Sequence, residues 1–386
     1  MLTRDLVELM QSIAPLDYAE DWDKVGLLVG DSARAVRGPV LLTIDLSEAV
    51  MSEAIQLKAG AIIAYHPPIF EPLARITDAT PRQRVILRAL EHNIAIYSPH
   101  TALDAIPHGV TDWLCEGLSG SAKPGHIAGD CRALSPNEHL PQSQQVKIVT
   151  FVAAKEVETI RNALASAGAG RIGKYQVCSF TTEGTGTFLG DASTNPTVGS
   201  AEHLESVREA RLEMVCSKSA LALALEILRK FHPYEEPAID VYELKRQPKR
   251  GAGAGRRLTL DKPISIHDLA VRLKAWVGRD QVRYALAATE TGVHADKYVS
   301  IIGVVPGAGG SLSRLARTEG CEVFVTGEMK HHDVLGALNA GMSVILGGHT
   351  STERGYLPRL REEMIKRSPG LNVIVSSVDK TPLIAV

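Results

Sequence analysis

The sequence lacks the cysteine patterns and the long apolar runs of secreted and membrane proteins. Its five cysteines are scattered singly, with no Cys-x-x-Cys pair, which argues against a disulfide framework and against a zinc site built from cysteines. No run of about 18 apolar residues occurs, so we expect no membrane span. The N-terminus, Met1-Leu2-Thr3-Arg4-Asp5, begins a charged amphipathic helix and not a signal peptide. These features together predict a cytoplasmic protein.

The chain also lacks a strong charge of either sign. Its formal net charge is −2, so no global field steers it to nucleic acid or to an anionic membrane, and we expect no direct nucleic-acid binding. A length of 386 residues suggests two or three domains, at roughly 150 residues per domain. The hydrophobic content of 45% is enough for a substantial core.

Strands and helices alternate in both outer parts of the sequence. Apolar strands are expected at 39–44, 61–66 and 94–98, and again at 298–305, 321–325 and 342–346. Such alternation is typical of α/β domains with a largely parallel sheet. In these sheets ligands bind beyond the carboxyl ends of the strands, so the residues that follow each strand are candidates for a site.

The middle of the sequence has a different pattern. Residues 118–145 are polar and rich in Gly, Ser and Pro, which indicates a linker. Residues 146–245 have the order β-α-β-β-α-β of a ferredoxin-like module, a pattern that by itself indicates no chemistry. The segment 232–237, His-Pro-Tyr-Glu-Glu-Pro, indicates a rigid connection, with a pocket or a subunit contact as the alternative. The basic, glycine-rich stretch 249–257 is expected to be a flexible joint.

The most informative segment is Gly347-Gly348-His349-Thr350-Ser351-Thr352-Glu353, which follows a strand-like run. The two glycines let the backbone turn tightly, and Thr350 or Ser351 is suited to cap a helix. His349 and Glu353 are four residues apart and therefore project from the same side of the first turn. An imidazole and a carboxylate in this arrangement are suited to share a metal ion. The alternative is a capped helix whose His and Glu face water.

Three other predicted strand ends carry residues of the same kind: His66, then His100 with Asp104, then Glu328 with His331 and His332. A single histidine at a strand end is more often structural, but a site between the two outer parts would collect all of these residues. Imidazole plus carboxylate ligands suit Zn, Mn, Fe, Co or Ni and not an oxygen-only Ca or Mg site. Two carboxylates with two or more imidazoles are suited to hold a metal pair about 3.5–4 Å apart.

A glycine-rich loop, Pro306-Gly307-Ala308-Gly309-Gly310-Ser311, follows the strand at 298–305. Successive backbone N–H groups in such a loop are suited to cradle an anion at a helix N-terminus. A tight turn between strand and helix is the alternative.

Five motifs, spread over nearly the whole chain, resemble those of the GTP cyclohydrolase I type 2 homologue family. They are Trp22-Asp23-Lys24-Val25-Gly26-Leu27, Tyr65-His66-Pro67-Pro68-Ile69-Phe70, Ser98-Pro99-His100-Thr101-Ala102-Leu103-Asp104, Gly327-Glu328-Met329-Lys330-His331-His332-Asp333, and Gly347 with His349-Thr350-Ser351-Thr352-Glu353. The resemblance implies an α/β protein of two similar lobes forming one metal-binding core, with an inserted PII-like ferredoxin-fold domain. The expected domains are an N-terminal lobe at 1–130, the insert at 146–245 and a C-terminal lobe at 255–386. It also implies a homo-oligomer, a trimer or a toroidal hexamer built from trimers.

The resemblance further implies two divalent cations per subunit. His66 and Asp104 are similar to ligands of one metal and His349 to a ligand of the other, with Glu353 as the bridge. The sequence departs from many relatives by having Tyr65 where they have a histidine. Because a tyrosine is a poor ligand unless ionised, the second metal would be under-ligated, weakly held, or completed by His100 or water.

The remaining polar residues of the motifs are expected to lie behind the ligands or to face the substrate: Tyr65, His100, Glu328, His331 and His332. In a hydrolase, a metal-activated water would attack, and Glu328 or a nearby histidine such as His331 would shuttle protons. The substrate would be a small molecule, either a purine nucleotide, as the family name suggests, or a phosphoester. The alternative is a metal-binding scaffold or regulatory interaction protein without turnover.

Overall fold

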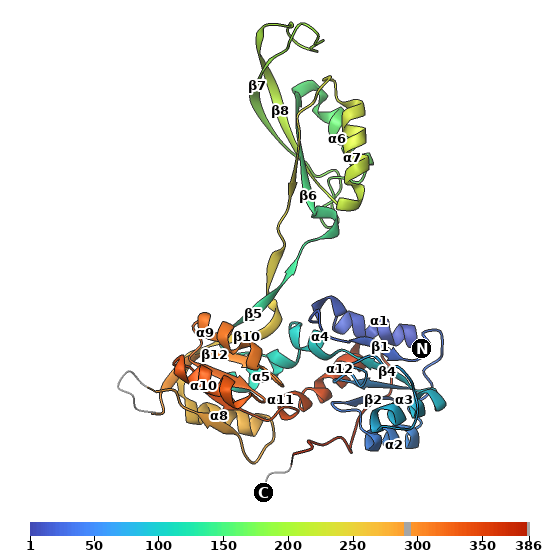
Figure 1. Cartoon of the computed structure of the whole chain (residues 1–386), viewed down its shortest axis with the longest axis vertical. Helices are drawn as coiled ribbons and strands as arrows, with labels where there is room; N and C mark the ends of the chain where they lie inside the picture. The colour runs from blue at the N-terminus through green and yellow to red at the C-terminus, as the bar shows by residue number, and fades with distance from the viewer. Residues whose placement is uncertain (289–294, 384–386) are drawn as a thin grey trace. The chain divides into compact units, whose positions relative to one another are not determined.

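The computed structural model describes residues 1–288 and 295–383. The chain forms two compact units (Figure 1): unit 1 comprises Met1–Asn137 and Lys249–Val386, and unit 2 comprises Glu138–Pro248. The helices of unit 1 are α1 (Thr3–Ile13), α2 (Glu48–Gln56), α3 (Pro81–Glu91), α4 (His100–Ala105), α5 (Val110–Ser119), α8 (Ile266–Trp276), α9 (Ser313–Thr318), α10 (His331–Asn339), α11 (Ser351–Arg354) and α12 (Leu357–Arg367), with short 3-10 turns η1 (Leu16–Tyr18) and η4 (Gly310–Leu312).

Unit 1 contains two sheets of the same general design. The first has five strands in the order β1-β4-β3-β2-β15, namely β1 (Gly26–Val29), β4 (Ala95–Ser98), β3 (Ala61–Ala64), β2 (Val40–Thr43) and β15 (Val373–Val375). Strands β4, β3, β2 and β15 are parallel, whereas β1 pairs antiparallel to β4. The sequence alternation had predicted this largely parallel arrangement, which brings the carboxyl ends of β2, β3 and β4 to one edge.

The second sheet has six strands in the order β11-β14-β13-β12-β10-β5. They are β11 (Arg283–Ala285), β14 (Ser343–Leu346), β13 (Val323–Thr326), β12 (Tyr298–Val305), β10 (Gln247–Ser265) and β5 (Asp130–His139). The central strands β12, β13 and β14 are parallel, and β10 and β11 pair antiparallel to β12 and β14. Here too, three parallel strands end at one edge of the sheet.

Both sheets are covered on their two faces, which explains why their parallel strands are almost entirely apolar. In β2, Val40 and Leu42 face one way, into a core shared by both sheets and by helices α1, α5, α8 and α12. Leu41 faces the other way, into a smaller core beneath α2 and α3. Phe324 of β13 likewise packs beneath α9 and α10. The shared core makes unit 1 a single packed body.

Two predicted connections turn out to be strands. Within the expected linker at 118–145, residues Asp130–His139 form β5, and the expected flexible joint at 249–257 lies within β10. Both joined the second sheet because their backbone groups pair with neighbouring strands, which local composition does not reveal. In addition, β15 from the C-terminal part of the chain lies in the first sheet, beside β2.

Arg256 anchors this part of β10 inside unit 1 through a buried guanidinium. Its guanidinium is 1% exposed and donates to Oδ1 of Asp112 over 2.5 Å. It also donates to the backbone carbonyls of Gly251, Gly253, Gly255, Ala105 and Ile106. A buried guanidinium is tolerated only when its N–H groups are satisfied in this way. The basic residue read from the sequence as part of a solvated joint is therefore an internal clamp.

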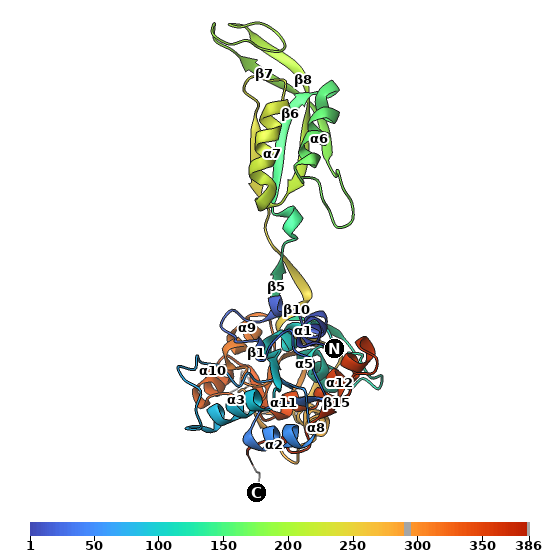
Figure 2. The same ribbon diagram turned by 90° about the vertical axis from the view of Figure 1, so that its right-hand side faces the viewer.

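Unit 2 has one four-stranded sheet in the order β7-β8-β6-β9, with antiparallel pairing throughout. Its elements are β6 (Val146–Ala153), α6 (Val157–Ser166), β7 (Phe180–Leu189), β8 (Leu204–Cys216), α7 (Lys218–Phe231) and β9 (Ile239–Glu243), with 3-10 turns η2 (Gln142–Gln144) and η3 (Ala154–Glu156). This is the predicted β-α-β-β-α-β order. Both helices cover the same face of the sheet (Figure 2), where Ile148, Leu164, Leu212 and Leu228 build the core.

The segment 232–237 begins with a buried residue. His232 is 7% exposed, and its Nε2 lies 3.3 Å from Oγ1 of Thr150. This contact supports the rigid connection, and later residues of the segment, Tyr234, Glu235 and Glu236, line a cavity of unit 2, which supports the pocket alternative as well. Among the described residues, no helix is both long and apolar enough to cross a membrane.

Candidate metal centre

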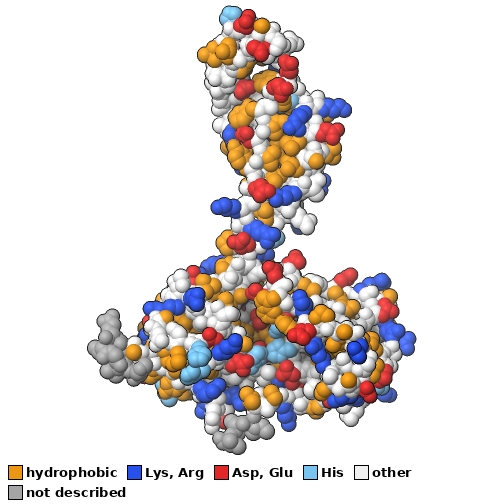
Figure 3. Space-filling model, in the orientation of Figure 1, with side chains coloured by type: hydrophobic (Ala, Val, Ile, Leu, Met, Phe, Trp, Pro, Cys, Tyr) orange, Lys and Arg blue, Asp and Glu red, His pale blue; other side chains and the backbone are white. Residues whose placement is uncertain are grey.

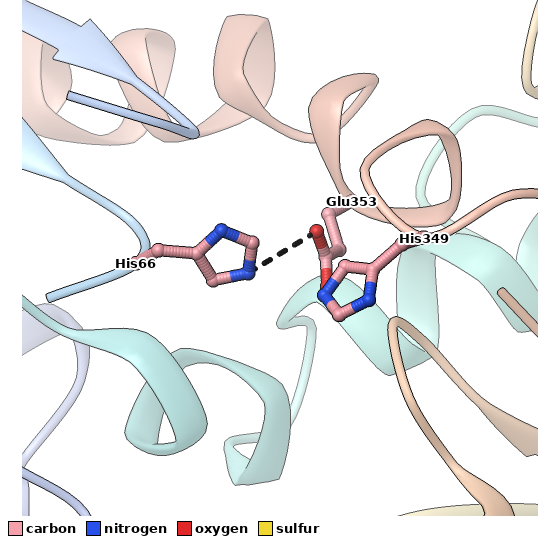
Figure 4. A group of neighbouring side chains, drawn as sticks. All are labelled: His66, His349 and Glu353. Carbon is pink, nitrogen blue, oxygen red and sulfur yellow. Dashed lines mark ion pairs between the residues drawn. The ribbon is translucent and has the colours of Figure 1, made fainter. Parts of the chain in front are cut away.

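Three metal-type side chains meet where the two sheets of unit 1 face each other. His66 follows β3 of the first sheet, His349 follows β14 of the second, and Glu353 lies in α11 just beyond it. Figure 4 shows the two imidazole rings on either side of the carboxylate. On the surface, histidine side chains lie beside acidic ones on one face of unit 1 (Figure 3). The carboxyl ends of parallel strands from both sheets thus supply one site, as expected for α/β folds.

The two histidines approach the two oxygens of the same carboxylate. Nε2 of His66 lies 3.5 Å from Oε2 of Glu353, and Nε2 of His349 lies 3.5 Å from Oε1. One ligand atom from each residue lies within 4.8 Å of the others. Glu353 is only 3% exposed, and its Oε2 is a buried atom without a hydrogen-bond partner among the described residues. A buried carboxylate oxygen without a partner costs free energy, and a bound cation would offset that cost.

Each imidazole is held through its other nitrogen. Nδ1 of His66 lies 2.8 Å from Oδ1 of Asp45, and Nδ1 of His349 lies 2.9 Å from Oε1 of Glu328. A carboxylate on Nδ1 keeps the hydrogen there and leaves Nε2 with a free lone pair. This carboxylate–histidine arrangement is the one that orients histidine ligands in metal sites.

The electrostatics of His66 also favour a positive charge at the centre. Burial opposes its protonation, but the hydrogen bond to Asp45 and the negative charges of Glu353 and Asp45 outweigh burial and raise the pKa of His66 to about 10. In the absence of a metal, a proton therefore supplies the positive charge between the carboxylates. A divalent cation would replace that proton.

Glycines let the backbone come close to these ligands. Gly307 follows β12 with a φ of +60°, and a Cβ there would lie 2.4 Å from Oε1 of Glu353 and 3.2 Å from Nε2 of His349. A Cβ on Gly327 would lie 2.7 Å from the Cα of His349. Hydrogen bonds join the loops after the parallel strands, from Glu328 N to Gly307 O and from Gly348 N to Gly327 O, both over 2.9 Å. The backbone loops beneath the candidate ligands His349 and Glu353 are therefore tightly packed and joined by hydrogen bonds.

The glycine-rich loop after β12 is a tight turn and not a free anion cradle. Gly307 donates its N–H to Oγ1 of Thr352 over 2.9 Å, and Gly309 donates its N–H to Oγ1 of Thr326 over 3.0 Å. Because these N–H groups already have partners inside the fold, they do not point toward a phosphate. Of the two interpretations of this loop, the structure supports the turn.

Asp104 lies near the centre but is engaged elsewhere. The hydroxyl of Tyr65 donates to Oδ1 of Asp104 over 2.5 Å, and Asp104 is absent from the group of mutually close ligand atoms found among the described residues. Burial raises the pKa of Asp104 to about 8, with the Glu353 charge adding to the effect and the Tyr65 hydrogen bond opposing it. Burial also raises the pKa of Tyr65 well above its usual value.

His100 occupies a neighbouring position on the first sheet. Its Nδ1 lies 2.7 Å from Oδ1 of Asp23, whose other oxygen accepts from Thr101. The ring of His100 lies 5.4 Å from that of His66 and 5.7 Å from that of Tyr65, measured between centroids. His100 thus borders the metal-type cluster without belonging to it.

The other two predicted histidines do not reach the cluster. His331 and His332 are exposed at the start of α10, with their rings 5.7 Å apart. Neither belongs to the close ligand group among the described residues. Glu328, in contrast, does reach the site, because it holds His349.

Sequence reasoning missed the two aspartates that hold the histidines. Asp45 belongs to none of the five family motifs, and Asp23 was named only as part of one of them. The usable signal for Asp45 was its position just after β2, the parallel neighbour of the strand that carries His66. The contact of Asp23 with His100, 77 residues further along the chain, has no local signal.

Comparisons with known proteins show the family of the chain and agree with its fold. A family model described as Duf34/NIF3 (NGG1p interacting factor 3) matches residues 1–382. The chain belongs to the Duf34/NIF3 family. A Bacillus subtilis member named GTP cyclohydrolase 1 type 2 homolog is 33% identical over 382 residues, which cover 98% of this chain and 97% of that protein. NIF3-like protein 1 of Bos taurus is 33% identical over 384 residues, covering 98% and 92%. The resemblance predicted from the motifs is confirmed.

Solved structures of the family match as well. A Bacillus cereus protein related to NIF3 superposes with a TM-score of 0.68 at 31% identity, covering 100% of this chain and 99% of that one. A Staphylococcus aureus protein superposes with a TM-score of 0.75 at 26% identity, with the same coverage. The mixed α/β architecture with several sheets is therefore that of Duf34/NIF3 structures.

Proposed function

We propose that this Duf34/NIF3 protein binds a divalent transition metal through Nε2 of His66, Nε2 of His349 and the carboxylate of Glu353. The observation that carries the proposal is the convergence of both Nε2 atoms on one buried carboxylate, each at 3.5 Å. The mixed nitrogen and oxygen donors suit Zn, Mn, Fe, Co or Ni. Because Asp45 and Glu328 already orient the rings, the site needs little rearrangement to accept a cation.

We further propose that the site serves a hydrolase. A metal held there would act as a Lewis acid and lower the pKa of a water molecule toward neutrality. Glu328 lies at the surface of the site with a side chain that is 51% exposed, so its carboxylate is placed to take a proton from water and return it to a leaving group. His331, predicted from the sequence for the same task, is less suited because it lies outside the cluster.

A nucleotide is the substrate class that we propose. Beside the cluster, the exposed ring of Trp22 lies 6.0 Å from the ring of His100 and 6.0 Å from that of Phe70. An exposed aromatic group of this kind offers a face on which a purine stacks. The name of the Bacillus subtilis relative, GTP cyclohydrolase 1 type 2 homolog, makes GTP the first compound to test.

The test is metal content followed by turnover. The purified chain, stripped and reloaded with Zn²⁺ or Mn²⁺, should retain metal after gel filtration, whereas Glu353→Gln should not. The loaded protein should then convert GTP or another purine nucleotide at a rate that Glu328→Gln lowers even when Zn²⁺ or Mn²⁺ is present at a saturating concentration. Retention of metal with no turnover of any nucleotide would eliminate the hydrolase and leave the metal site. Absence of metal in the reloaded protein would eliminate both.

A regulatory scaffold is the second candidate, and one observation favours it. Unit 2 contains a cavity of about 690 Å³, lined among others by Phe151, Arg211, Tyr234 and Glu235, which is within the usual range for small-molecule sites. The family description, NGG1p interacting factor 3, also names an interaction and not a reaction. In a scaffold, Glu353→Gln would change partner binding or assembly, and no nucleotide would be turned over.

We also propose a PII-like character for unit 2 and a cytoplasmic homo-oligomer, a trimer or a hexamer. The exposed apolar side chains on the sheet of unit 2 support an assembly surface: Phe180, Leu189, Leu204, Val241 and Tyr242. Light scattering at several protein concentrations tests this, since a monomeric mass at all concentrations would contradict it.

A further inference from the structure

We infer that the metal centre holds a single cation, because Tyr65 keeps Asp104 out of the ligand set and fills the space beside it. This inference rests on the proposed metal site and refines it. A second cation would need a further ligand, and the family resemblance implies Asp104 for that role. The contacts of Tyr65 argue against that arrangement.

The first observation is the short hydrogen bond between the two residues. The Tyr65 hydroxyl donates to Oδ1 of Asp104 over 2.5 Å, so a lone pair of that oxygen is engaged by the phenol. A phenol that donates its hydrogen presents no anionic oxygen to a metal. One carboxylate oxygen is therefore directed at a donor and not at a cation.

The second observation is that Tyr65 is locked in place. The residue is 2% exposed, and its backbone N–H donates to the carbonyl of Thr43 over 2.9 Å while its carbonyl accepts from Oγ of Ser98 over 2.8 Å. Its ring packs 5.1 Å from the ring of His66 and 5.7 Å from that of His100. A side chain with this packing does not swing aside to admit an ion without disrupting its neighbours.

The third observation concerns which side chains near the site could coordinate a cation. Within residues 1–288 and 295–383, the only set of three His, Cys, Asp or Glu side chains whose ligand atoms lie mutually close is His66, His349 and Glu353. His100, the nearest additional imidazole, is held through Nδ1 by Asp23. One cation would take all three of these ligands, and no second group of this kind includes Asp104 among the described residues.

The experiment is a Co²⁺ titration of the full-length chain, followed by visible absorption, with metal per subunit determined afterwards by elemental analysis. The native protein should give one break at one equivalent. Asp104→Asn, which keeps an acceptor for the Tyr65 hydroxyl, should also bind one equivalent. Glu353→Gln should bind none. Tyr65→His, which exchanges a phenol donor for a metal-binding imidazole and releases Asp104, should move the break to two equivalents.

The outcomes separate this inference from the proposed function. Two equivalents in the native protein would overturn the single-cation inference and leave the metal site standing. Loss of the cation in Asp104→Asn would do the same, because Asp104 would then be a ligand. No binding in the native protein would overturn the metal site itself. A folded Tyr65→His protein that still binds one equivalent would overturn the role given to Tyr65. If that variant does not fold, the numbers of cations bound by the native protein and by Asp104→Asn test the single-cation inference.

Discussion

Nδ1 of His66 lies 2.8 Å from Oδ1 of Asp45, and the two residues come from the ends of the neighbouring parallel strands β3 and β2. The contact fixes which nitrogen of His66 faces Glu353. It also sets the charge of the site when no metal is bound. Two of the predictions below depend on this pair.

Removing the charge of Asp45 should weaken metal binding without removing a ligand. Asp45→Asn keeps the size of the side chain but gives His66 a weaker partner, so we expect the affinity for Zn²⁺ to fall by about 10- to 100-fold. Competition with a chelating dye measures the change. Asp261→Asn, at an exposed aspartate of β10, is the matched control and should leave the affinity unchanged. Equal affinities for all three proteins would contradict the role of Asp45.

The metal-free protein should lose stability as the pH rises above neutrality. The pKa of His66 is raised to about 10 in the folded protein, from about 6.5 in an unfolded chain. Since the folded state binds this proton more tightly, the stabilisation is complete below about pH 6.5 and disappears as the pH rises through about 10. The raised pKa of Asp104 acts in the same direction, over a lower range that ends near pH 8.

Urea denaturation between pH 6 and pH 10 measures this effect. All three tryptophans, Trp22, Trp113 and Trp276, lie in unit 1, so their fluorescence reports on the unit that contains the site. Asp45→Asn should flatten the slope above pH 8, where Asp104 has already titrated. A stability that rises with pH in the metal-free native protein would show that His66 is not held as a cation.

A methyl group at Gly307 should damage the site beyond its effect on the backbone. The Cβ of Gly307→Ala would lie 2.4 Å from Oε1 of Glu353, so the ligand must move and metal binding should fall at least tenfold. Gly320→Ala is a matched control, because Gly320 also has a positive φ, +79°, but an added Cβ meets nothing within 4 Å. Left-handed strain alone costs roughly 1–2 kcal/mol.

Comparing the unfolding free energies and Zn²⁺ affinities of these two variants separates the two effects. Both should be destabilised by the backbone strain, but only Gly307→Ala should lose affinity. If both variants bind Zn²⁺ as the native protein does, the close approach of Gly307 to the ligands has no functional consequence.

Arg256 should be among the most sensitive positions of unit 1. Arg256→Ala leaves Asp112 and several buried carbonyls without their donor, and breaking a buried pair of this kind costs about 3–5 kcal/mol. Arg250→Ala removes an exposed pair with Asp130 and should cost less than about 1 kcal/mol. Urea denaturation followed by tryptophan fluorescence compares the two. Similar losses for both variants would contradict the assignment of Arg256 as a clamp.

Local patterns in the sequence were sufficient for much of the architecture. Predominantly apolar runs of five to eight residues predicted β2, β3, β4, β12, β13 and β14, because parallel strands buried on both faces have few polar positions. The four-residue spacing of His349 and Glu353 placed both on one side of the turn after β14, since that geometry depends only on neighbouring residues. The end of the strand at 61–66 singled out His66, and the family motifs implied its role as a metal ligand.

Contacts between distant segments required the tertiary structure. Sequence composition predicted flexible connections where β5 and β10 are paired strands, because strand pairing depends on partners far along the chain. The strand-end pattern also placed His331 and His332 near the expected site, and both lie exposed at the start of α10, outside the cluster of His66, His349 and Glu353 among the described residues. The partners of the histidines, Asp45 and Asp23, depend on which strands are neighbours, and that order is settled only when the sheet forms.

The sequence alone therefore identified His, Asp and Glu residues at the strand ends, because the end of an apolar run and the residues that follow it are local features. Which of those residues converge was decided by the packing of two sheets around one core. That packing brings His66 within 3.5 Å of Glu353, 287 positions later in the chain, and it directs Asp104 to Tyr65. Distances of this kind follow from how the sheets pack, because short-range chain geometry does not constrain residues so far apart.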